Sequence, residues 1–189
     1  ANRAAIRSLI QPRDHVILDA QAHPAFFDAA RAITRNVHRS PHGSTDGVER
    51  RLRRLRRENP QAGLLVVTTG VAAFTSVSPD LPALIDLCRE HRATLLVDVA
   101  HDLGALGPSG RGVIEAQGVM GRIDVVTGSF AKCFGVNGGF VGSRDGALKA
   151  GLRFGRGGQG CSAALSPASA AAALTAIGLI DSADGTARR

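Results

Sequence analysis

The stretch Thr94–Asp98 (TLLVD), continued by VAHDLGALGPSGRG up to Gly112, decides how the fold is read. Leu95, Leu96 and Val97 are consecutive apolar residues, a pattern typical of a strand that helices cover on both faces, as in a parallel sheet. The strand ends on an acid, Asp98, and sheets of this kind bind ligands at the carboxyl ends of their strands. The stretch therefore predicts a covered sheet with a ligand site near Asp98.

The rest of the chain alternates similar apolar runs with helical patterns. Helices are expected where apolar residues recur at helical spacing, as at Leu81, Leu84 and Ile85. Strands are expected at residues 15–19, 36–38, 64–68, 94–98, 123–127 and 139–142. Helices are expected at residues 24–33, 80–91 and 166–180, and in the arginine-rich stretch near residues 49–58. This order predicts an α/β fold with a mostly parallel sheet flanked by helices.

Composition excludes several classes of protein. The 189 residues are 44% hydrophobic and 21% charged, which is ordinary for one globular domain and excludes a disordered chain. Aromatic residues make up 4%, with no Trp or Tyr, so a base-stacking platform for nucleic acid is not expected. The sequence contains no apolar run typical of a signal peptide or a membrane span.

The cysteines and most of the histidines carry no metal motif. Three widely spaced cysteines without a CxxC pair predict a reducing compartment, and therefore a cytoplasmic protein without a disulfide framework or a metal site. Cys133 is expected to serve packing. Four histidines outside any motif are expected to be ordinary surface or loop residues: His15, His38, His42 and His91.

The net charge of +7 is concentrated in one segment, ERRLRRLRRE at residues 49–58, which holds six arginines. Val48, Leu52 and Leu55 recur at helical spacing and predict an amphipathic helix with a cap near Thr45 or Asp46. One interpretation is a solvated surface helix. The other is a docking patch for an anionic partner, such as a CoA phosphate, an acyl-carrier protein, a lipid headgroup or a nucleic acid, and charge alone does not choose between them.

A second polar site follows the next strand of the expected sheet. The sequence SFAKCFG places Lys132 after that strand, and only one other lysine, Lys149, occurs in the chain. An acid at one strand end and a lysine after a neighbouring strand suit pyridoxal phosphate (PLP). That cofactor forms a Schiff base with a lysine and needs a carboxylate beside its ring nitrogen.

These motifs together resemble the α-oxoamine synthases, a family of fold-type I PLP-dependent enzymes. The resemblance rests on DVAHDLGALGPSGRG, GSFAKCFGVNGGFVGS and the Ser-rich segment GCSAALSP before an Ala-rich helix. It implies that Lys132 forms the Schiff base and later moves the α proton, and that Asp98 pairs with the ring nitrogen. It also implies that His101 contacts the phenolic oxygen of the ring and that His23 stacks on its face.

The resemblance assigns two further residues and contains three departures. Ser129 matches a phosphate-contacting residue, and Ser162 matches one that reaches the phosphate in the neighbouring subunit. Thr69 replaces the family's Asp or Glu, Ala73 replaces its Ser, and Val99 replaces the Glu of its Asp-Glu-Ala-His motif. The first two departures remove polar groups near the cofactor, so ring positioning or substrate choice is expected to differ.

The implied reaction condenses a small amino acid with an acyl thioester, on CoA or a carrier protein, with decarboxylation to an α-aminoketone. The implied assembly is a homodimer with a shared active site. Residues 1–189 would be the PLP-binding large domain without the family's N-terminal segment and small C-terminal domain. Two alternatives remain open from the residues themselves: another fold-type I activity, such as an aminotransferase or a lyase, and a non-catalytic pseudoenzyme subunit.

Overall fold

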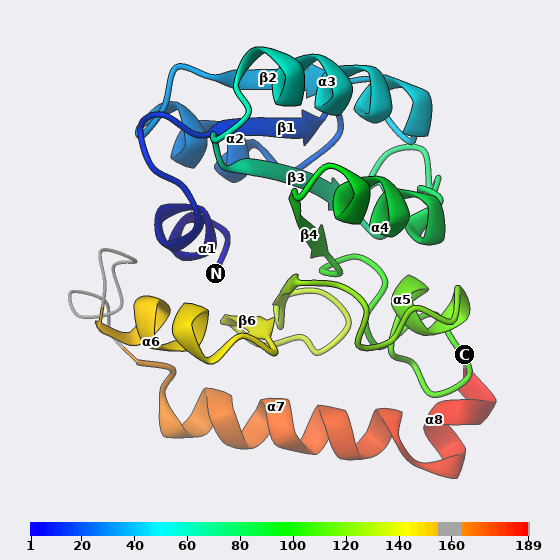
Figure 1. Ribbon diagram of the computed structural model, residues 1–189. Helices are drawn as coiled ribbons and strands as arrows, with labels where there is room; N and C mark the ends of the chain where they lie inside the picture. Colours follow the sequence, from blue (N-terminus) through cyan, green and yellow to red (C-terminus); the bar gives the residue numbers. More distant parts are fainter. Residues whose placement is uncertain (155–163, 189) are drawn as a thin grey trace.

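The computed structural model describes residues 1–154 and 164–188, and a six-stranded sheet lies at its centre (Figure 1). The strands are β1 (His15–Asp19), β2 (Val37–Ser40), β3 (Leu64–Thr69), β4 (Thr94–Asp98), β5 (Val125–Ser129) and β6 (Gly139–Ser143). Their order is β2-β1-β3-β4-β5-β6; the first five are parallel, and β6 is antiparallel to β5. The predicted mostly parallel α/β sheet is confirmed.

Helices cover both faces of this sheet. They are α1 (Asn2–Leu9), α2 (Pro24–Arg31), α3 (Thr45–Glu58), α4 (Leu81–Glu90), α5 (Val113–Ala116), α6 (Gly146–Phe154), α7 (Pro167–Ile180) and α8 (Ala183–Arg188). Successive strand residues point to opposite faces. Val66 and Val97 therefore pack with α3, α4 and α5, whereas Val67 and Leu96 pack with α1, α2 and α6. The long α7 runs past the β6 end of the molecule (Figure 1).

Several predicted boundaries differ from the observed ones by one or two residues. β5 begins at Val125 rather than residue 123, because its pairing with β4 starts there, opposite Leu96. The cap of α3 is Ser44, whose hydroxyl accepts a 3.0 Å bond from Gly47 N, so the predicted cap at Thr45 or Asp46 was one or two residues late. The helices α1, α5, α6 and α8 were not predicted; α1 is short, with eight residues, of which Ala5 and Ile6 are buried.

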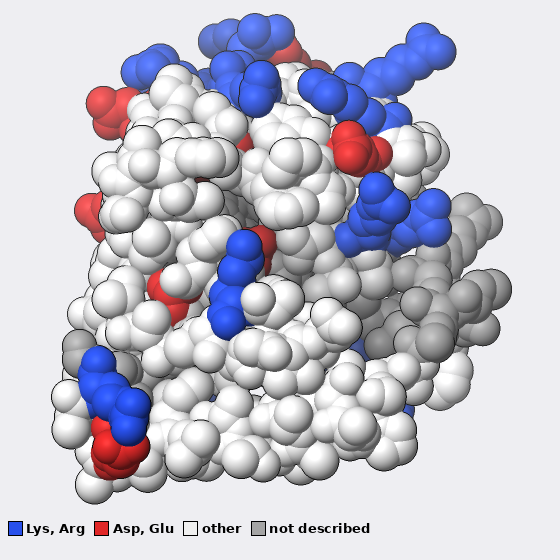
Figure 2. Space-filling model, turned by 180° about the vertical axis from the view of Figure 1, so that it is seen from behind, with Lys and Arg blue, Asp and Glu red and all other residues white. Residues whose placement is uncertain are grey.

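The arginine-rich helix α3 lies beside the β2 edge of the sheet, where Figure 2 shows basic side chains gathered at one end of the molecule. Arg53 pairs with Glu49, and Arg54 pairs with Glu58 at 3.0 Å, each one helical turn away. Within residues 1–154 and 164–188, the other arginines of the helix except Arg56 make no hydrogen bond or ion pair: these are Arg50, Arg51 and Arg57.

Arg56 has a structural role that the sequence did not indicate. Its guanidinium donates to the carbonyl of His91 at 2.9 and 3.0 Å, and to that of Arg92 at 3.2 Å. It also donates to Pro60 O and Ala62 O, both at 2.9 Å. One side chain therefore ties α3 to the end of α4 and to the loop that leads into β3.

Two of the four histidines without a motif, His15 on β1 and His38 on β2, are not surface or loop residues, so the prediction was wrong for these two; His42 and His91 lie in turns, as predicted. His15 and His38 stack with centroids 5.4 Å apart, and their Nδ1 and Nε2 atoms lie 3.1 Å apart. His42 Nδ1 lies 2.9 Å from Asp19 Oδ1, and its Nε2 is buried. His91 also has a buried Nε2 atom.

The stacked pair makes stability depend on pH. Burial lowers the pKa of His15 and of His38, and at His38 the charges of His15, Arg51 and Arg54 lower it further. The folded state thus binds fewer protons than the unfolded chain once the pH falls below 6.5, the ordinary histidine pKa. We expect the free energy of unfolding to decrease on acidification through that range, and His38→Gln to weaken this dependence.

Urea unfolding of both proteins at about pH 5 and about pH 7.5 measures the effect. An equal change in the free energy of unfolding in parent and variant would rule out this role for the pair.

The remaining sequence-based expectations concern cysteines and membranes. Cys88 is buried, which raises the pKa of its thiol to about 12, whereas Cys133 is exposed; Cys161 lies outside the described residues. In the described part of the chain, no helix is long and apolar enough to cross a membrane. In the same residues, no group of three or more His, Cys, Asp and Glu side chains is arranged to hold a metal ion.

Candidate active site

Asp98 is the buried acid of the site. It is the last residue of β4, is 5% exposed, and accepts hydrogen bonds from Asn2 Nδ2 and Ala100 N, both at 3.2 Å. Burial raises the pKa of this carboxyl, while these two bonds and the nearby His101 act in the opposite direction. No cationic side chain in the described residues forms an ion pair with Asp98. A cation placed against Asp98 would therefore stabilise its ionised form.

His101 is where the predicted catalytic residues converge. Burial lowers the pKa of its imidazole, and the charges of Lys132 and His23 lower it further, whereas Asp98 raises it. Such charge effects require proximity. The charges of His23, Asp98 and Lys132 thus all act on His101, although His23 and Lys132 are 109 positions apart in the sequence, and all four residues lie at or after the carboxyl ends of strands.

His23 caps the helix that follows β1. Its Nδ1 accepts a bond from Ala25 N at 3.1 Å, so the proton of the neutral imidazole belongs on Nε2. The side chain is exposed, which leaves its ring face accessible to a ligand.

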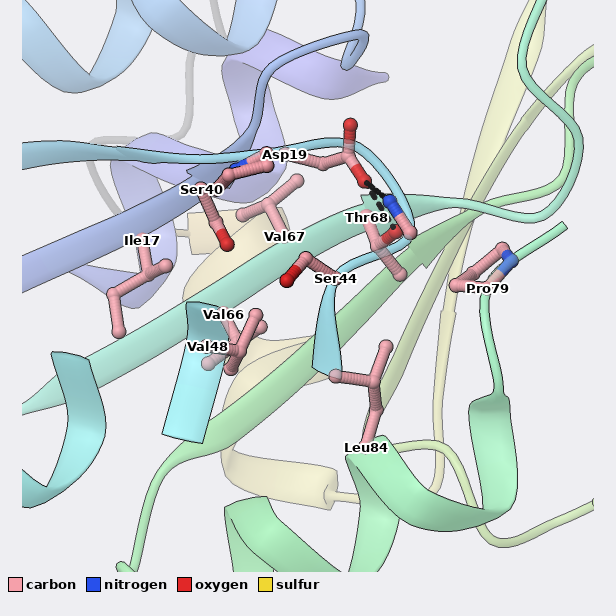
Figure 3. Close-up of a pocket in the computed structure, with 12 residues that line it drawn as sticks. Ile17, Asp19, Ser40, Ser44, Val48, Val66, Val67, Thr68, Pro79 and Leu84 are labelled. Carbon is pink, nitrogen blue, oxygen red and sulfur yellow. Dashed lines mark hydrogen bonds between the residues drawn. The ribbon is translucent and has the colours of Figure 1, made fainter. Parts of the chain in front are cut away.

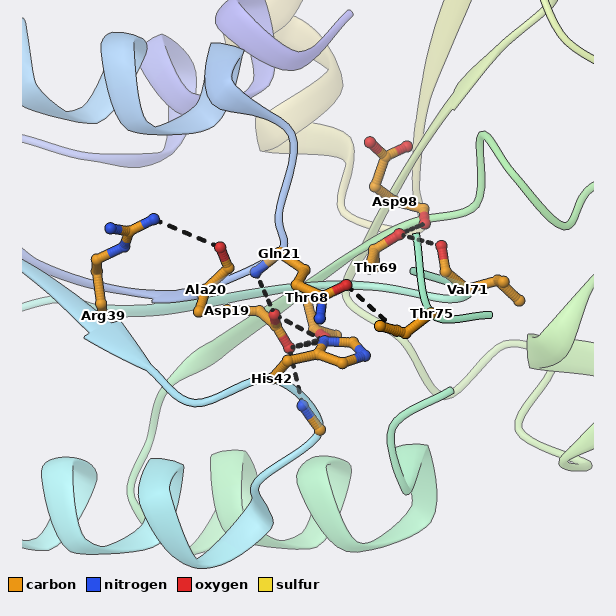
Figure 4. A network of polar contacts seen from close by, with 11 residues as sticks. Asp19, Ala20, Gln21, Arg39, His42, Thr68, Thr69, Val71, Thr75 and Asp98 are labelled. Carbon is orange, nitrogen blue, oxygen red and sulfur yellow. Dashed lines mark hydrogen bonds and ion pairs between the residues drawn. The ribbon is translucent and has the colours of Figure 1, made fainter. Parts of the chain in front are cut away.

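A polar network fixes the backbone that leads to His23 (Figure 4). The carboxylate of Asp19, at the end of β1, accepts from Gln21 N at 2.8 Å and from Gly43 N at 3.2 Å, besides its contact with His42. The Gln21 side chain in turn accepts a 3.3 Å bond from Thr75 Oγ1. The loop between β1 and α2 is thus anchored to two neighbouring loops.

Lys132 lies in a tight turn between β5 and β6. Gly135 N donates to Lys132 O at 3.0 Å, and Val136 N donates to Phe130 O at 2.8 Å, which closes the turn. Phe134 is buried against Phe130, at 5.4 Å between ring centroids, and fixes the turn to the sheet. The Lys132 side chain itself is exposed and free to reach a ligand above Asp98.

Of the two residues predicted to contact the phosphate, Ser129 and Ser162, the structure describes Ser129 only. Ser129 ends β5, but its hydroxyl accepts from Ala131 N at 3.1 Å and thus caps the lysine turn. Ser162 lies outside the described residues.

The three residues that depart from the family pattern have different surroundings. Thr69 donates its hydroxyl proton to Val71 O, 3.0 Å away, Ala73 is exposed, and Val99 packs in the core at 1% exposure. A buried carboxyl does lie beside Thr69, because Asp102 packs against Gly70.

Two cavities of the described structure lie away from this open edge. A pocket between the sheet and α3, lined in part by Asp19, Ser44 and Thr68 (Figure 3), has a volume of about 10 Å³, room for roughly one water molecule. A cavity of about 560 Å³ lies between α1 and α6, at the opposite edge of the sheet, beside Thr94 and Asp124.

Sequence reasoning missed two polar residues of the site, Asp19 and Asp102, and the contact of Asn2 with Asp98. Asp19 carried the same signal as Asp98, an acid at the end of an apolar strand, and could have been found. Asn2 lies 96 positions from Asp98, so no local pattern connects the two.

Comparison with known proteins places the chain in a family. The model of the aminotransferase class I and II family matches residues 1–189. The chain belongs to this family. Among its relatives, the serine palmitoyltransferase of Sphingomonas paucimobilis is 39% identical over 141 residues, 75% of this chain and 33% of that protein. The 8-amino-7-oxononanoate synthase of Geobacter metallireducens is 36% identical over 190 residues, 100% of this chain and 47% of that protein.

Solved structures of the family agree with the fold. The serine palmitoyltransferase of Sphingomonas wittichii superposes with a TM-score of 0.87 at 34% identity, covering 96% of this chain and 44% of that one. A serine palmitoyltransferase solved with PLP as an internal aldimine gives a TM-score of 0.87 at 36% identity, covering 97% of this chain and 45% of that one. The predicted fold class and the resemblance to the α-oxoamine synthases are confirmed. The chain spans less than half the length of these relatives.

Proposed function

We propose that the protein is a PLP-dependent acyltransferase that condenses a small amino acid with an acyl thioester, on CoA or a carrier protein, to give an α-aminoketone. In this reaction a bond forms between the amino acid Cα and the acyl carbonyl carbon, the thiol leaves, and the Cα–carboxylate bond breaks to release CO₂. The convergence of Lys132, Asp98 and His23 on His101 carries the proposal. The relatives named serine palmitoyltransferase and 8-amino-7-oxononanoate synthase support the reaction class.

The residues present fit PLP. Asp98 is a buried carboxyl that forms no ion pair in the described residues, and a protonated ring nitrogen would supply the missing cation. When bound, PLP supplies an electron sink for charge that develops at Cα. Lys132 would hold the cofactor and carry the α proton, His101 would donate to the ring oxygen, and His23 would cover the ring face. Ser129 and Ser162 would contact the phosphate.

We also propose the setting in which this site works. Residues 1–189 form the PLP-binding large domain of a longer cytoplasmic enzyme, which acts as a homodimer with a shared active site. The greater length of the relatives supports the first point. Exposed apolar side chains on α7, Leu174 at 69% and Leu179 at 59%, are compatible with a covering subunit.

Covalent trapping tests the proposal, because the chain contains only two lysines. We expect borohydride reduction after incubation with PLP to fix the cofactor on Lys132, as read by peptide mass mapping. Lys132→Ala should abolish the adduct, and Lys149→Ala should retain it. Absence of an adduct would favour the pseudoenzyme alternative, and an adduct on Lys149 alone would refute the assigned site.

A second assay separates the proposed reaction from other activities of the fold. Thiol release from acyl-CoA or an acyl-carrier protein should depend on added glycine, alanine or serine. Transfer of the amino group to a keto acid, without thiol release, would instead identify an aminotransferase.

A further inference from the structure

Asp102 is a buried acid that has no assigned role in the proposed reaction. It follows His101 directly, and its side chain is 0% exposed. Oδ2 accepts a bond from Val113 N at 2.8 Å, at the start of α5. Oδ1 is also buried, and no described residue forms a hydrogen bond with it. Burying a carboxylate oxygen without a hydrogen-bond partner costs free energy, so the presence of aspartate at this position calls for a structural or functional explanation.

Two glycines enclose this carboxyl from different segments. A Cβ atom at Gly70, after β3, would lie 2.6 Å from Oδ1, and one at Gly112, before α5, would lie 2.3 Å from Oδ2. Atoms that are not bonded to each other do not come this close, so a Cβ atom at either glycine would collide with the carboxyl. The backbone at Gly70 and at Gly112 can approach Asp102 because glycine has no side chain. The carboxyl therefore joins the end of β3 to the start of α5.

The loop that Asp102 opens packs on the turn that holds Lys132. The carbonyl of Asp102 accepts from Ala105 N at 3.1 Å and from Leu106 N at 3.0 Å, which starts the loop. Within the loop, a Cβ on Gly104 would lie 2.8 Å from Cys133 Sγ, so the loop backbone touches the residue next to Lys132. A continuous set of contacts thus runs from Asp102 to the lysine turn.

We infer that Asp102 is a positioning residue: its buried carboxyl sets the loop of residues 103–112, and through Gly104 and Cys133 it sets the turn that carries Lys132. The inference rests on the proposed function for its catalytic consequence, but not for the packing itself.

The same carboxyl makes the position of the turn sensitive to pH. Burial raises the pKa of Asp102 to about 6, and the charge of Asp98 on β4 raises it as well, while the Val113 bond lowers it. Gly70, Gly112 and Val113, which also lie against this carboxyl, carry no charge. The carboxyl of Asp102 is therefore protonated and deprotonated within the pH range in which a cytoplasmic enzyme works. Oδ1, which accepts no hydrogen bond from a described residue, is the atom that can receive the proton.

The thiol of Cys133 reports on the turn without any cofactor. Cys88 is buried and has a raised pKa, and a Cys161→Ser background leaves Cys133 as the reactive thiol. We expect Asp102→Ala to change the rate of Cys133 modification by a chromogenic disulfide at least about threefold, because the loop loses its anchor. In the parent, the logarithm of the rate should deviate from a straight line against pH near pH 6, and in Asp102→Asn it should not.

Asp124→Asn is the matched control, since Asp124 Oδ2 also accepts one backbone bond, from Leu95 N at 2.8 Å, but at the opposite edge of the sheet. This variant should keep the parental rate and pH profile. Circular dichroism establishes that each variant is folded. Folded Asp102 variants with parental Cys133 profiles would overturn the inference.

A cofactor readout separates this inference from the proposed function. In the PLP-treated protein, Asp102→Asn should shift the pH at which the visible absorbance changes, and Asp124→Asn should not. If the parent binds no PLP, the proposed function fails, and the thiol profiles still decide the role of Asp102. If the parent binds PLP and Asp102→Asn leaves the absorbance profile unchanged, the carboxyl has no effect on the cofactor site, and the positioning role is refuted for the proposed reaction.

Discussion

Replacement of Asp98 by asparagine is expected to lower kcat/KM for thiol release by about a thousandfold, the range typical of a lost acid–base or charge partner. Asn is isosteric and can still accept the bond from Ala100 N, so the end of β4 should keep its structure. It cannot carry the negative charge that holds a ring nitrogen protonated. The loss should appear in kcat and in the dissociation constant of PLP, both measured on folded protein.

Asp124→Asn provides the control for this experiment too, because it changes an acid that accepts a backbone bond far from the carboxyl edge. Its kcat/KM should stay within about twofold of the parent, as for a surface change remote from the site. Parental activity in Asp98→Asn would show that this carboxyl does not support the cofactor.

Arg56→Ala is expected to lower the free energy of unfolding by about 2–4 kcal/mol, since hydrogen bonds from a charged donor contribute roughly 1.5–3 kcal/mol and several carbonyls lose theirs together. The guanidinium serves four carbonyls, those of Pro60, Ala62, His91 and Arg92. Arg56→Lys should recover only part of the loss, because an ammonium group lacks the planar set of five donors. Urea unfolding with a constant m-value gives the difference.

Arg57→Ala is the matched control on the same helix. Arg57 is exposed and makes no hydrogen bond or ion pair in the described structure, so its loss should change the free energy of unfolding by less than about 0.5 kcal/mol. Equal effects at the two positions would mean that the carbonyl contacts of Arg56 add no stability.

The centre of the sheet could be predicted because β1, β3 and β4 are buried on both faces. The consecutive apolar run LLVV in β3 has no polar face that would blur the pattern, and all six residues of the strand are buried. The antiparallel direction of β6 had no such signal, since Gly139–Ser143 is only partly buried and rich in glycine. Helix α1 was missed because its eight residues are too few to give a repeated apolar pattern, and a helix of that length depends on packing for its stability.

The positions of the candidate catalytic residues at the carboxyl edge of the sheet could be predicted from local motifs, and the contacts that support them could not. Asp98, His101 and Lys132 stand beside strand ends, where position along the chain already fixes position in the sheet. The contacts of Arg56 with His91, and of Asn2 with Asp98, join segments whose separation in sequence carries no pattern. The burial of His15 was missed because it depends on the stacking of His38 from the neighbouring strand β2, which lies 23 positions away in the sequence.

The close approach of Gly70 and Gly112 to Asp102 has a consequence for how this sequence can change over time. A methyl group at either glycine would collide with the carboxyl, so neither position can accept alanine while aspartate remains. Gly112 also has a φ of +80°, which disfavours other residues on its own account, whereas Gly70 is held only by the neighbouring acid. Homologues in which a smaller residue replaces this aspartate should therefore tolerate a side chain at the Gly70 position, and the two positions should covary.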